Sequence, residues 1–151
     1  MLRERAVGTL LPAVTMTIER GRLRLFAKAT GQTDPIYTQV DAANAAGLPD
    51  LPVPPTFLSS IEQEVPDPFA WLAELGVDLR MILHGEQAFS YHAMAFAGDT
   101  LTAEPRIADT YVKRGGALEF IVKQTAIRRA DGEAVADLES VIVVRHPEVV
   151  A

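Results

Sequence analysis

A histidine and a carboxylate lie two residues apart in the segment Leu83-His84-Gly85-Glu86-Gln87. Residues two apart point to the same side of an extended chain, so His84 and Glu86 are expected to share a face. A histidine beside a carboxylate near a pocket can act as a general base whose pKa is tuned by the contact. The same residues, with Gln87, also fit a structural hydrogen-bonding corner at the start of a strand, and both interpretations stay open.

The segment from Thr30 to Tyr37 carries a second set of candidate groups. Asp34 is either an acid or orienting group, or the initiator of a turn, because Asp-Pro often begins one. The Tyr37 hydroxyl can donate a hydrogen bond to a ligand carbonyl, or it can belong to a half-buried tyrosine at a helix end. By its residue type alone, Gln32 is a polar loop residue.

A third candidate is the segment Pro55-Thr56-Phe57, where a stretch with four prolines, at 49, 52, 54 and 55, ends. Thr56 is expected to cap a helix that runs from Phe57 to Glu64. Backbone amides at the beginning of a helix can polarise a carbonyl oxygen, which would make this helix end a binding site. The same residues also fit a helix cap with a purely structural role, and this interpretation is compatible with a binding site.

The elements that must position these groups divide the chain into a helical first half and a strand-rich second half. Val14 to Ile18 is a short β-branched stretch, and apolar residues at helical spacing then run to Gly31, a natural residue after a helix end. Asp41 is expected to cap a short helix closed by Gly47. Another short helix is expected between Asp67-Pro68 and Gly76.

From Leu83 onward the hydrophobic period changes to two. Three long strands are expected, at Leu101 to Lys113, Leu118 to Arg129 and Val135 to Arg145. Their length is about twice the usual five or six residues, which implies a strongly curved sheet. Pro105 fits only an edge position or a bulge. The expected fold class is therefore α+β, an antiparallel sheet wrapped around the helix after Thr56.

Composition limits what the chain can be. It has 151 residues, 48% of them hydrophobic, and no run of eighteen apolar residues, which favours one soluble domain over residues 1–151 and no membrane partner. No signal-like apolar segment opens the sequence, so a cytoplasmic location is expected. The absence of cysteine excludes disulfides and thiolate metal sites. A charge of −6 without long charged blocks argues against nucleic acid. The three histidines lack metal-ligand spacing, and no metal or cofactor is expected.

Several blocks together resemble a known family. In chain order they are Phe-Ala-x-Ala-x-Gly, x-x-Asp-Pro-x-Tyr, Pro-Pro-Thr-Phe-Leu, Leu-His-Gly-Glu-Gln and Ala-Gly-Asp-Thr-Leu-Thr, and they run from about Ile18 to Val144. This order is similar to the hot-dog fold of MaoC-like dehydratases and (R)-specific enoyl-CoA hydratases. More narrowly, it resembles the FAS1-like dehydratase branch, found as the N-terminal half of two-domain hydratases and as separate subunits.

The resemblance implies a hot-dog domain that binds acyl groups as CoA or acyl-carrier-protein thioesters. Catalytic members of the family hydrate or dehydrate these chains with the Asp and His of a Gly-Asp-x-Asn-Pro-x-His loop. Aligned on Gly31 and Pro35, this chain has Gln32 in place of the Asp and Tyr37 in place of the His. A glutamine amide is no base near neutral pH, and a phenol of ordinary pKa, about 10, is a poor one. Such halves usually shape the acyl pocket while a second hot-dog half carries the Asp and His.

The resemblance therefore implies an acyl-binding subunit of a hydratase or dehydratase, paired with a second hot-dog chain or with itself. The catalytic residues stay unknown, with candidates Asp34, Tyr37, His84 and Glu86. The substrate-binding residues are expected to be Gln32, Tyr37, Pro55, Thr56, Phe57, His84 and Gln87. A homodimer that binds acyl-CoA without turnover is the alternative. An acyl-CoA thioesterase with Glu86 or Asp34 as its base ranks third. Hot-dog thioesterases usually place their carboxylate on the central helix, and here Glu62 and Glu64 lie only at the far end of that helix.

Overall fold

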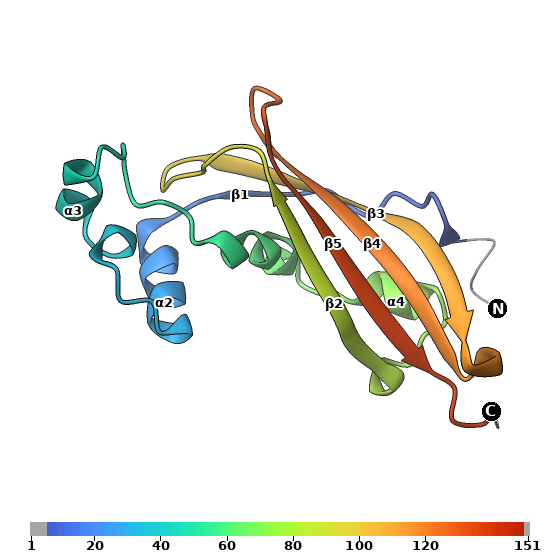
Figure 1. The fold of residues 1–151 in the computed structure, drawn as a ribbon. Coiled ribbons are helices and arrows are strands. Elements are labelled where there is room, and N and C mark those ends of the chain that lie inside the picture. The colour runs from blue at the N-terminus through green and yellow to red at the C-terminus, as the bar shows by residue number, and fades with distance from the viewer. Residues whose placement is uncertain (1–5, 150–151) are drawn as a thin grey trace.

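The computed structural model describes residues 6–149, and its centre is a single antiparallel sheet of five strands (Figure 1). The strands follow the order β1-β3-β4-β5-β2 across the sheet. Their bounds are β1 Val14–Thr17, β2 Ile82–Tyr91, β3 Thr100–Lys113, β4 Leu118–Arg129 and β5 Ala134–Arg145. The predicted long strands and the α+β class are confirmed. Alternating hydrophobic residues are a reliable signal here, because only one face of each strand is buried in the core.

The helix η2, Pro55–Glu64, lies against the inner face of the sheet (Figure 1). Phe57, Leu58 and Ile61 are its buried residues. The helix is of the 3₁₀ type, and the hydroxyl of Ser60 donates to the Phe57 carbonyl oxygen at 2.6 Å, three residues back. Such back-bonding from serine occupies a carbonyl that would otherwise accept within the helix, and it favours this tighter winding.

The predicted cap of this helix is wrong. The residue before the helix is Pro54, whose side chain makes no cap, and Thr56 is an exposed residue inside the first turn. Pro55 already has the backbone angle of a first helical residue and needs no amide partner there, so the helix begins one residue earlier than a threonine cap would place it.

The other short helices begin near, but not at, the predicted residues. Helix α2, Arg20–Thr30, ends as predicted at Gly31, which adopts a left-handed φ of 71°. Helix α3, Val40–Ala45, follows an extended Gln39, so Asp41 lies in the first turn instead of capping it. Helix α4, Ala70–Glu74, starts after Asp67. The Asp67 carboxylate accepts a hydrogen bond from the Phe69 amide at 3.0 Å and closes a turn before the helix.

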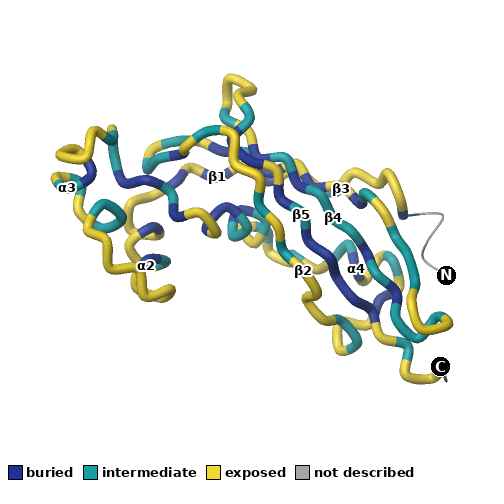
Figure 2. Tube along the Cα trace, viewed as in Figure 1, coloured by how far each residue is buried: buried dark blue, intermediate teal, exposed yellow. Residues whose placement is uncertain are grey.

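The core on the inner face of the sheet has two parts, and the buried segments of the strands follow it (Figure 2). One part surrounds η2 and includes Phe57 and Ile61, and the other lies beneath α4 and includes Leu72 and Ile121. Between them the sheet carries polar side chains, with Lys123 and Thr125 of β4 both bonded to Glu62 of η2. This polar contact joins the central helix to the middle of the sheet.

Pro105 occupies an edge position, as predicted. Strand β1 pairs with β3 only from Thr100 to Ala103, so β3 has no full neighbour beside Pro105. The Pro105 carbonyl accepts a hydrogen bond from the Leu11 amide at 2.9 Å, on the side away from β4. The missing proline amide therefore breaks no ladder bond.

Candidate functional site

The loop after α2 is a compact turn built by its own polar side chains. The Gln32 side-chain oxygen accepts from the Asp34 amide at 3.1 Å, and the Asp34 carboxylate accepts from the Ile36 amide at 3.1 Å. Asp34 thereby caps the short 3₁₀ helix η1, Pro35–Tyr37. Gln32 and Asp34 are both exposed. Their side chains hold the shape of the loop, which is the structural interpretation of Asp34 that the sequence left open.

Tyr37 lines a pocket beneath this loop. The pocket has a volume of about 320 Å³ and is bounded by Tyr37, residues 52–55, Leu58, residues 91–95 and Val135. We call it the Tyr37–Tyr91 pocket. Its walls are mainly apolar, with few polar side chains to orient a ligand, as is usual for sites that bind small molecules. The structure thus brings Tyr37 to the beginning of the central helix.

Tyr91, at the end of β2, was not among the predicted site residues. Its hydroxyl donates to the Pro55 carbonyl oxygen at 2.6 Å, and its ring stacks on Phe89 with centroids 5.9 Å apart. Burial raises the pKa of the Tyr91 phenol above its usual value of 10. The alternation of β2 already places Tyr91 on the same face as Phe89, which is the signal that could have found it.

The beginning of η2 contributes Pro55 to this pocket, whereas its neighbours point elsewhere. Thr56 is exposed and lies outside the pocket lining. Phe57 is buried, and its ring meets Phe26 of α2 edge to face at 5.4 Å. The Phe57 amide donates to the Pro54 carbonyl at 3.0 Å. Of the three predicted residues at this helix end, Pro55 lines the pocket and Phe57 anchors the helix to α2.

His84, Glu86 and Gln87 are not brought to the pocket. A bulge interrupts β2 between His84 and Glu86, so His84 pairs with Ile142 and Glu86 with Val141. Adjacent residues of β5 face opposite sides of the sheet, and cross-strand partners face the same side. The prediction that His84 and Glu86 share a face is therefore wrong, because the extra residue of the bulge reverses the alternation.

Gln87 has a structural partner. Its side-chain oxygen accepts a hydrogen bond from the Ser140 hydroxyl of β5. This pair lies on the inner face, where Ser140 is buried. Gln87 satisfies a buried hydroxyl there and does not line the Tyr37–Tyr91 pocket.

The other two histidines each have a carboxylate neighbour from a distant strand. His92 borders the Tyr37–Tyr91 pocket, and its Nε2 lies 2.7 Å from Asp137 of β5. The Nε2 of His146 lies 3.2 Å from the buried Glu119 of β4. Strand pairing brings Asp137 to His92 and Glu119 to His146, whereas a third carboxylate, Glu148, lies 3.4 Å from His146 Nδ1 and only two residues away in the chain. No group of three or more potential ligands is arranged for a metal within residues 6–149.

The carboxylates of the central helix are already engaged. Glu62 is bonded to Lys123 and accepts from the Thr125 hydroxyl at 2.6 Å. Glu64 lies 2.6 Å from Arg22, and the hydrogen bond from that guanidinium lowers the pKa of the Glu64 carboxyl. Neither carboxylate lines the Tyr37–Tyr91 pocket. A catalytic carboxylate from η2 is therefore not available to a ligand bound there.

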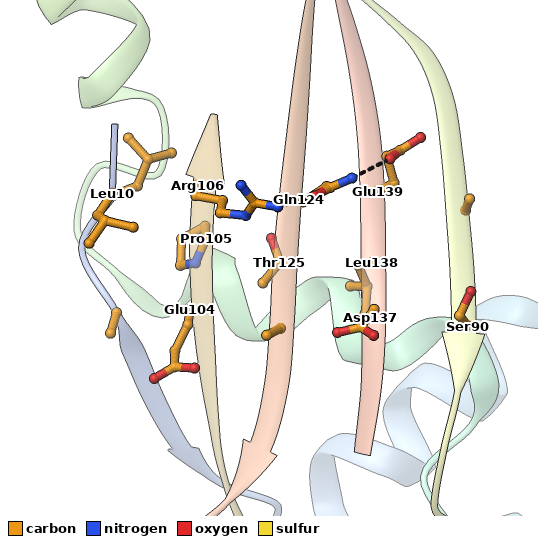
Figure 3. A pocket seen from close by; sticks show the side chains of 14 residues that line it. Leu10, Ser90, Glu104, Pro105, Arg106, Gln124, Thr125, Asp137, Leu138 and Glu139 are labelled. Carbon is orange, nitrogen blue, oxygen red and sulfur yellow. Dashed lines mark hydrogen bonds between the residues drawn. The ribbon is translucent and has the colours of Figure 1, made fainter. Parts of the chain in front are cut away.

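A second hollow, of about 780 Å³, lies on the outer face of the sheet, away from η2 (Figure 3). A polar chain crosses three strands in it, from the Arg106 guanidinium to Gln124 at 2.7 Å and from Gln124 to the Glu139 carboxylate at 2.8 Å. In Figure 3 the central helix, η2, passes behind the strands that carry these side chains. None of the predicted site residues lines the hollow, and several of its polar side chains already bond to residues outside it, such as Asp137 to His92 and Thr125 to Glu62.

The comparisons with known proteins agree with this architecture. Residues 5–138 match the family described as the FAS1-like, dehydratase domain region. The chain is 36% identical over 137 residues to a UPF0336 protein of Leifsonia xyli, with 91% of each chain covered. It is 31% identical over 134 residues to a UPF0336 protein of Saccharopolyspora erythraea, covering 89% of this chain and 85% of that one.

Solved structures show the same fold. The C-terminally truncated HadBC (3R-hydroxyacyl-ACP dehydratase) complex of Mycobacterium tuberculosis aligns with a TM-score of 0.74 at 25% identity, over 89% of this chain and 92% of that chain. A MaoC-like dehydratase aligns with a TM-score of 0.81 at 21% identity, over 98% of this chain and 44% of the longer one. The predicted hot-dog fold is thereby confirmed. Within the described residues, no helix is long and apolar enough to cross a membrane.

Proposed function

Because the chain belongs to the FAS1-like dehydratase family, we propose that it is the acyl-thioester-binding subunit of an (R)-specific enoyl hydratase or 3-hydroxyacyl dehydratase. The observation that carries the proposal is the loop over the Tyr37–Tyr91 pocket. It keeps the glycine and proline of the hydratase loop, while Gln32 and Tyr37 occupy the positions of the family's Asp and His. The pocket can hold an apolar chain, and it offers the phenols of Tyr37 and Tyr91, of which only Tyr37 stands at a position of the family's catalytic pair.

The proposal includes a second hot-dog subunit that supplies the missing Asp and His. Strand β2 pairs with β5 alone among the described strands, so its outer edge is open. Two usual protections of an exposed edge, proline and lysine, are absent from its ten residues, and its bulge is confined to the first half of the strand, between His84 and Glu86. Leu83 and Tyr91 are each about half exposed on this strand, at 50% and 49%. The HadBC and ChsH1–ChsH2 structures that resemble this chain are themselves complexes of two different subunits.

The direct experiment compares the pure chain with a pair. The chain is purified alone and with a hot-dog protein that has an intact Gly-Asp-x-Asn-Pro-x-His loop, and hydration of crotonyl-CoA is followed by loss of the conjugated double bond. Activity only in the pair is expected. Robust turnover by the pure chain refutes the proposal. A stable homodimer that binds acyl-CoA and gains nothing from a partner supports the binding-protein alternative, and release of free thiol supports a thioesterase.

A gain-of-function variant tests the loop itself. The triple substitution Gln32→Asp, Asp34→Asn and Tyr37→His restores the family loop in the frame of Gly31 and Pro35. General acid–base groups contribute roughly 10²- to 10⁴-fold in rate, so the variant is expected to hydrate crotonyl-CoA by itself at least tenfold above the unchanged chain. Tyr37→His alone is the control, since it lacks the acid partner. If the triple variant folds, binds crotonyl-CoA and stays inactive, the loop is not the site of chemistry.

A further inference from the structure

The proton of the Tyr91 hydroxyl is already used within the protein. A proline carbonyl has no hydrogen to donate, so in the 2.6 Å contact between Tyr91 and Pro55 the phenol must be the donor. A hydroxyl has one proton and two lone pairs. The side of the Tyr91 oxygen that a ligand meets therefore offers lone pairs, and the residue acts as a hydrogen-bond acceptor in the pocket.

This arrangement is rigid enough to select a ligand. The Tyr91 ring lies parallel to Phe89, with an interplanar angle of 3°. The residue also ends the β2 ladder, opposite Ala136 of β5. A phenol of ordinary pKa, about 10, is protonated at neutral pH, and burial raises the pKa of Tyr91 further, so the hydroxyl can keep donating to Pro55. A fixed acceptor favours a ligand whose donor meets it, because that ligand gains a hydrogen bond that a ligand without a donor lacks.

Tyr37, which also lines the pocket, complements Tyr91. Its hydroxyl has no hydrogen-bond partner within residues 6–149 and can turn to donate. The pocket thus combines one hydroxyl able to donate with one oxygen able only to accept. A ligand that meets both groups needs a carbonyl oxygen to accept from Tyr37 and a hydroxyl group to donate to Tyr91.

A 3-hydroxyacyl thioester has these two groups, on carbons 1 and 3. A saturated or 2-enoyl thioester has the carbonyl alone, and would leave the Tyr91 oxygen facing a C–H group. We propose that Tyr91 is a specificity-determining residue that selects 3-hydroxyacyl thioesters by accepting a hydrogen bond from the 3-hydroxyl, while Tyr37 donates to the thioester carbonyl. This inference rests on the proposed function and names the form of the substrate that the subunit holds.

Binding measurements on the full chain test it without catalysis. Isothermal titration calorimetry compares (3R)-3-hydroxybutyryl-CoA with butyryl-CoA, which lacks the hydroxyl and cannot be dehydrated. One neutral hydrogen bond changes affinity by roughly three- to tenfold, so the hydroxylated thioester is expected to bind tighter by that factor. The Tyr91→Phe variant keeps the ring and its stacking and is expected to bind both thioesters equally.

Two further variants separate the two phenols from general effects. Tyr37→Phe is expected to lower the affinity for both thioesters by the same factor, because both carry the carbonyl. Tyr111→Phe is the matched control, since Tyr111 also stacks on a phenylalanine, with Phe120 at 4.7 Å, but lies outside the pocket. It should leave both affinities unchanged.

The possible results separate this inference from the proposed function. Equal affinity of the unchanged chain for the two thioesters overturns the role of Tyr91, even if Tyr91→Phe fails to fold, and leaves an acyl-binding subunit standing. A preference that survives in a folded Tyr91→Phe variant overturns it as well. Failure of the folded, unchanged chain to bind either thioester overturns the proposed function itself.

Discussion

Replacing Lys123 by methionine is expected to lower the free energy of unfolding by about 3 kcal/mol, because it strands a carboxylate in the core. Lys123 and Glu62 are bonded across the space between β4 and η2, with side chains only 13% and 11% exposed. Without Lys123, the Glu62 carboxylate keeps one partner, the Thr125 hydroxyl at 2.6 Å. Breaking a fully buried pair costs about 3 to 5 kcal/mol, and the slight exposure here favours the lower end.

Replacing Glu62, the other member of the pair, should lower the free energy of unfolding by less than replacing Lys123 does. Glu62→Gln keeps an acceptor for Thr125 and leaves the Lys123 ammonium at the end of a flexible side chain. That chain borders a cavity of about 360 Å³ through which the ammonium can approach water. A loss of about 2 kcal/mol is expected. The double variant removes both charges and should also lose only about 2 kcal/mol, so the two substitutions are coupled by about 3 kcal/mol.

Urea unfolding followed by circular dichroism, at fixed protein concentration, measures all four proteins of this cycle. Arg80→Gln is the control, because Arg80 and Asp78 form an exposed pair, at 84% and 41% exposure, whose loss should change the stability far less than the loss of the buried pair. Single losses below 1 kcal/mol with an additive double variant would refute the reasoning. They would mean that water reaches Glu62 and Lys123 freely and that the polar contact between the two core regions stabilises nothing.

Two further predictions concern the backbone and pH. Gly85→Ala should lower stability by about 1 to 3 kcal/mol, since a Cβ there would lie 2.9 Å from the Val143 side chain. Gly21→Ala, in open space on α2, should instead raise stability by up to about 1 kcal/mol. Urea unfolding of the two variants measures both changes. The Arg80 hydrogen bonds lower the pKa of Asp78 from 3.8 to about 2. This carboxylate therefore adds stability above about pH 4 that is lost as the pH falls through about 2, and NMR titration of Arg80→Gln should return its midpoint toward 3.8.

The elements were largely readable from the sequence, while their first residues were not. A period of two over Leu118–Arg129 required only that one face of a sheet be buried. Gly31 ended α2 because its left-handed φ of 71° is easy only for glycine. Thr56 looked like a cap by residue type, but Pro54 and Pro55 decided the start of η2. Capping depends on the backbone that enters a helix, and neighbouring residues set that path.

The candidate site was also only partly predictable from the sequence. The order of motifs located the loop and Tyr37, and Tyr37 does line a pocket. Tyr91 was missed, because its partner Pro55 lies 36 residues away in the chain and only the fold brings the two together. His84 and Glu86 were expected on one face, and a single bulged residue placed them on opposite faces.

The sequence by itself indicated the long curved strands, through their period of two, and the hot-dog class, through a resemblance carried by the order of several motifs. The same resemblance places Gln32 and Tyr37 at the positions of the hydratase acid and base. All of these can be read along the chain. Only the tertiary structure decided which groups share a pocket, which carboxylates are already paired, and which way the Tyr91 proton points. Those are relations between distant segments, fixed when the sheet packs against η2, and no local pattern carries them.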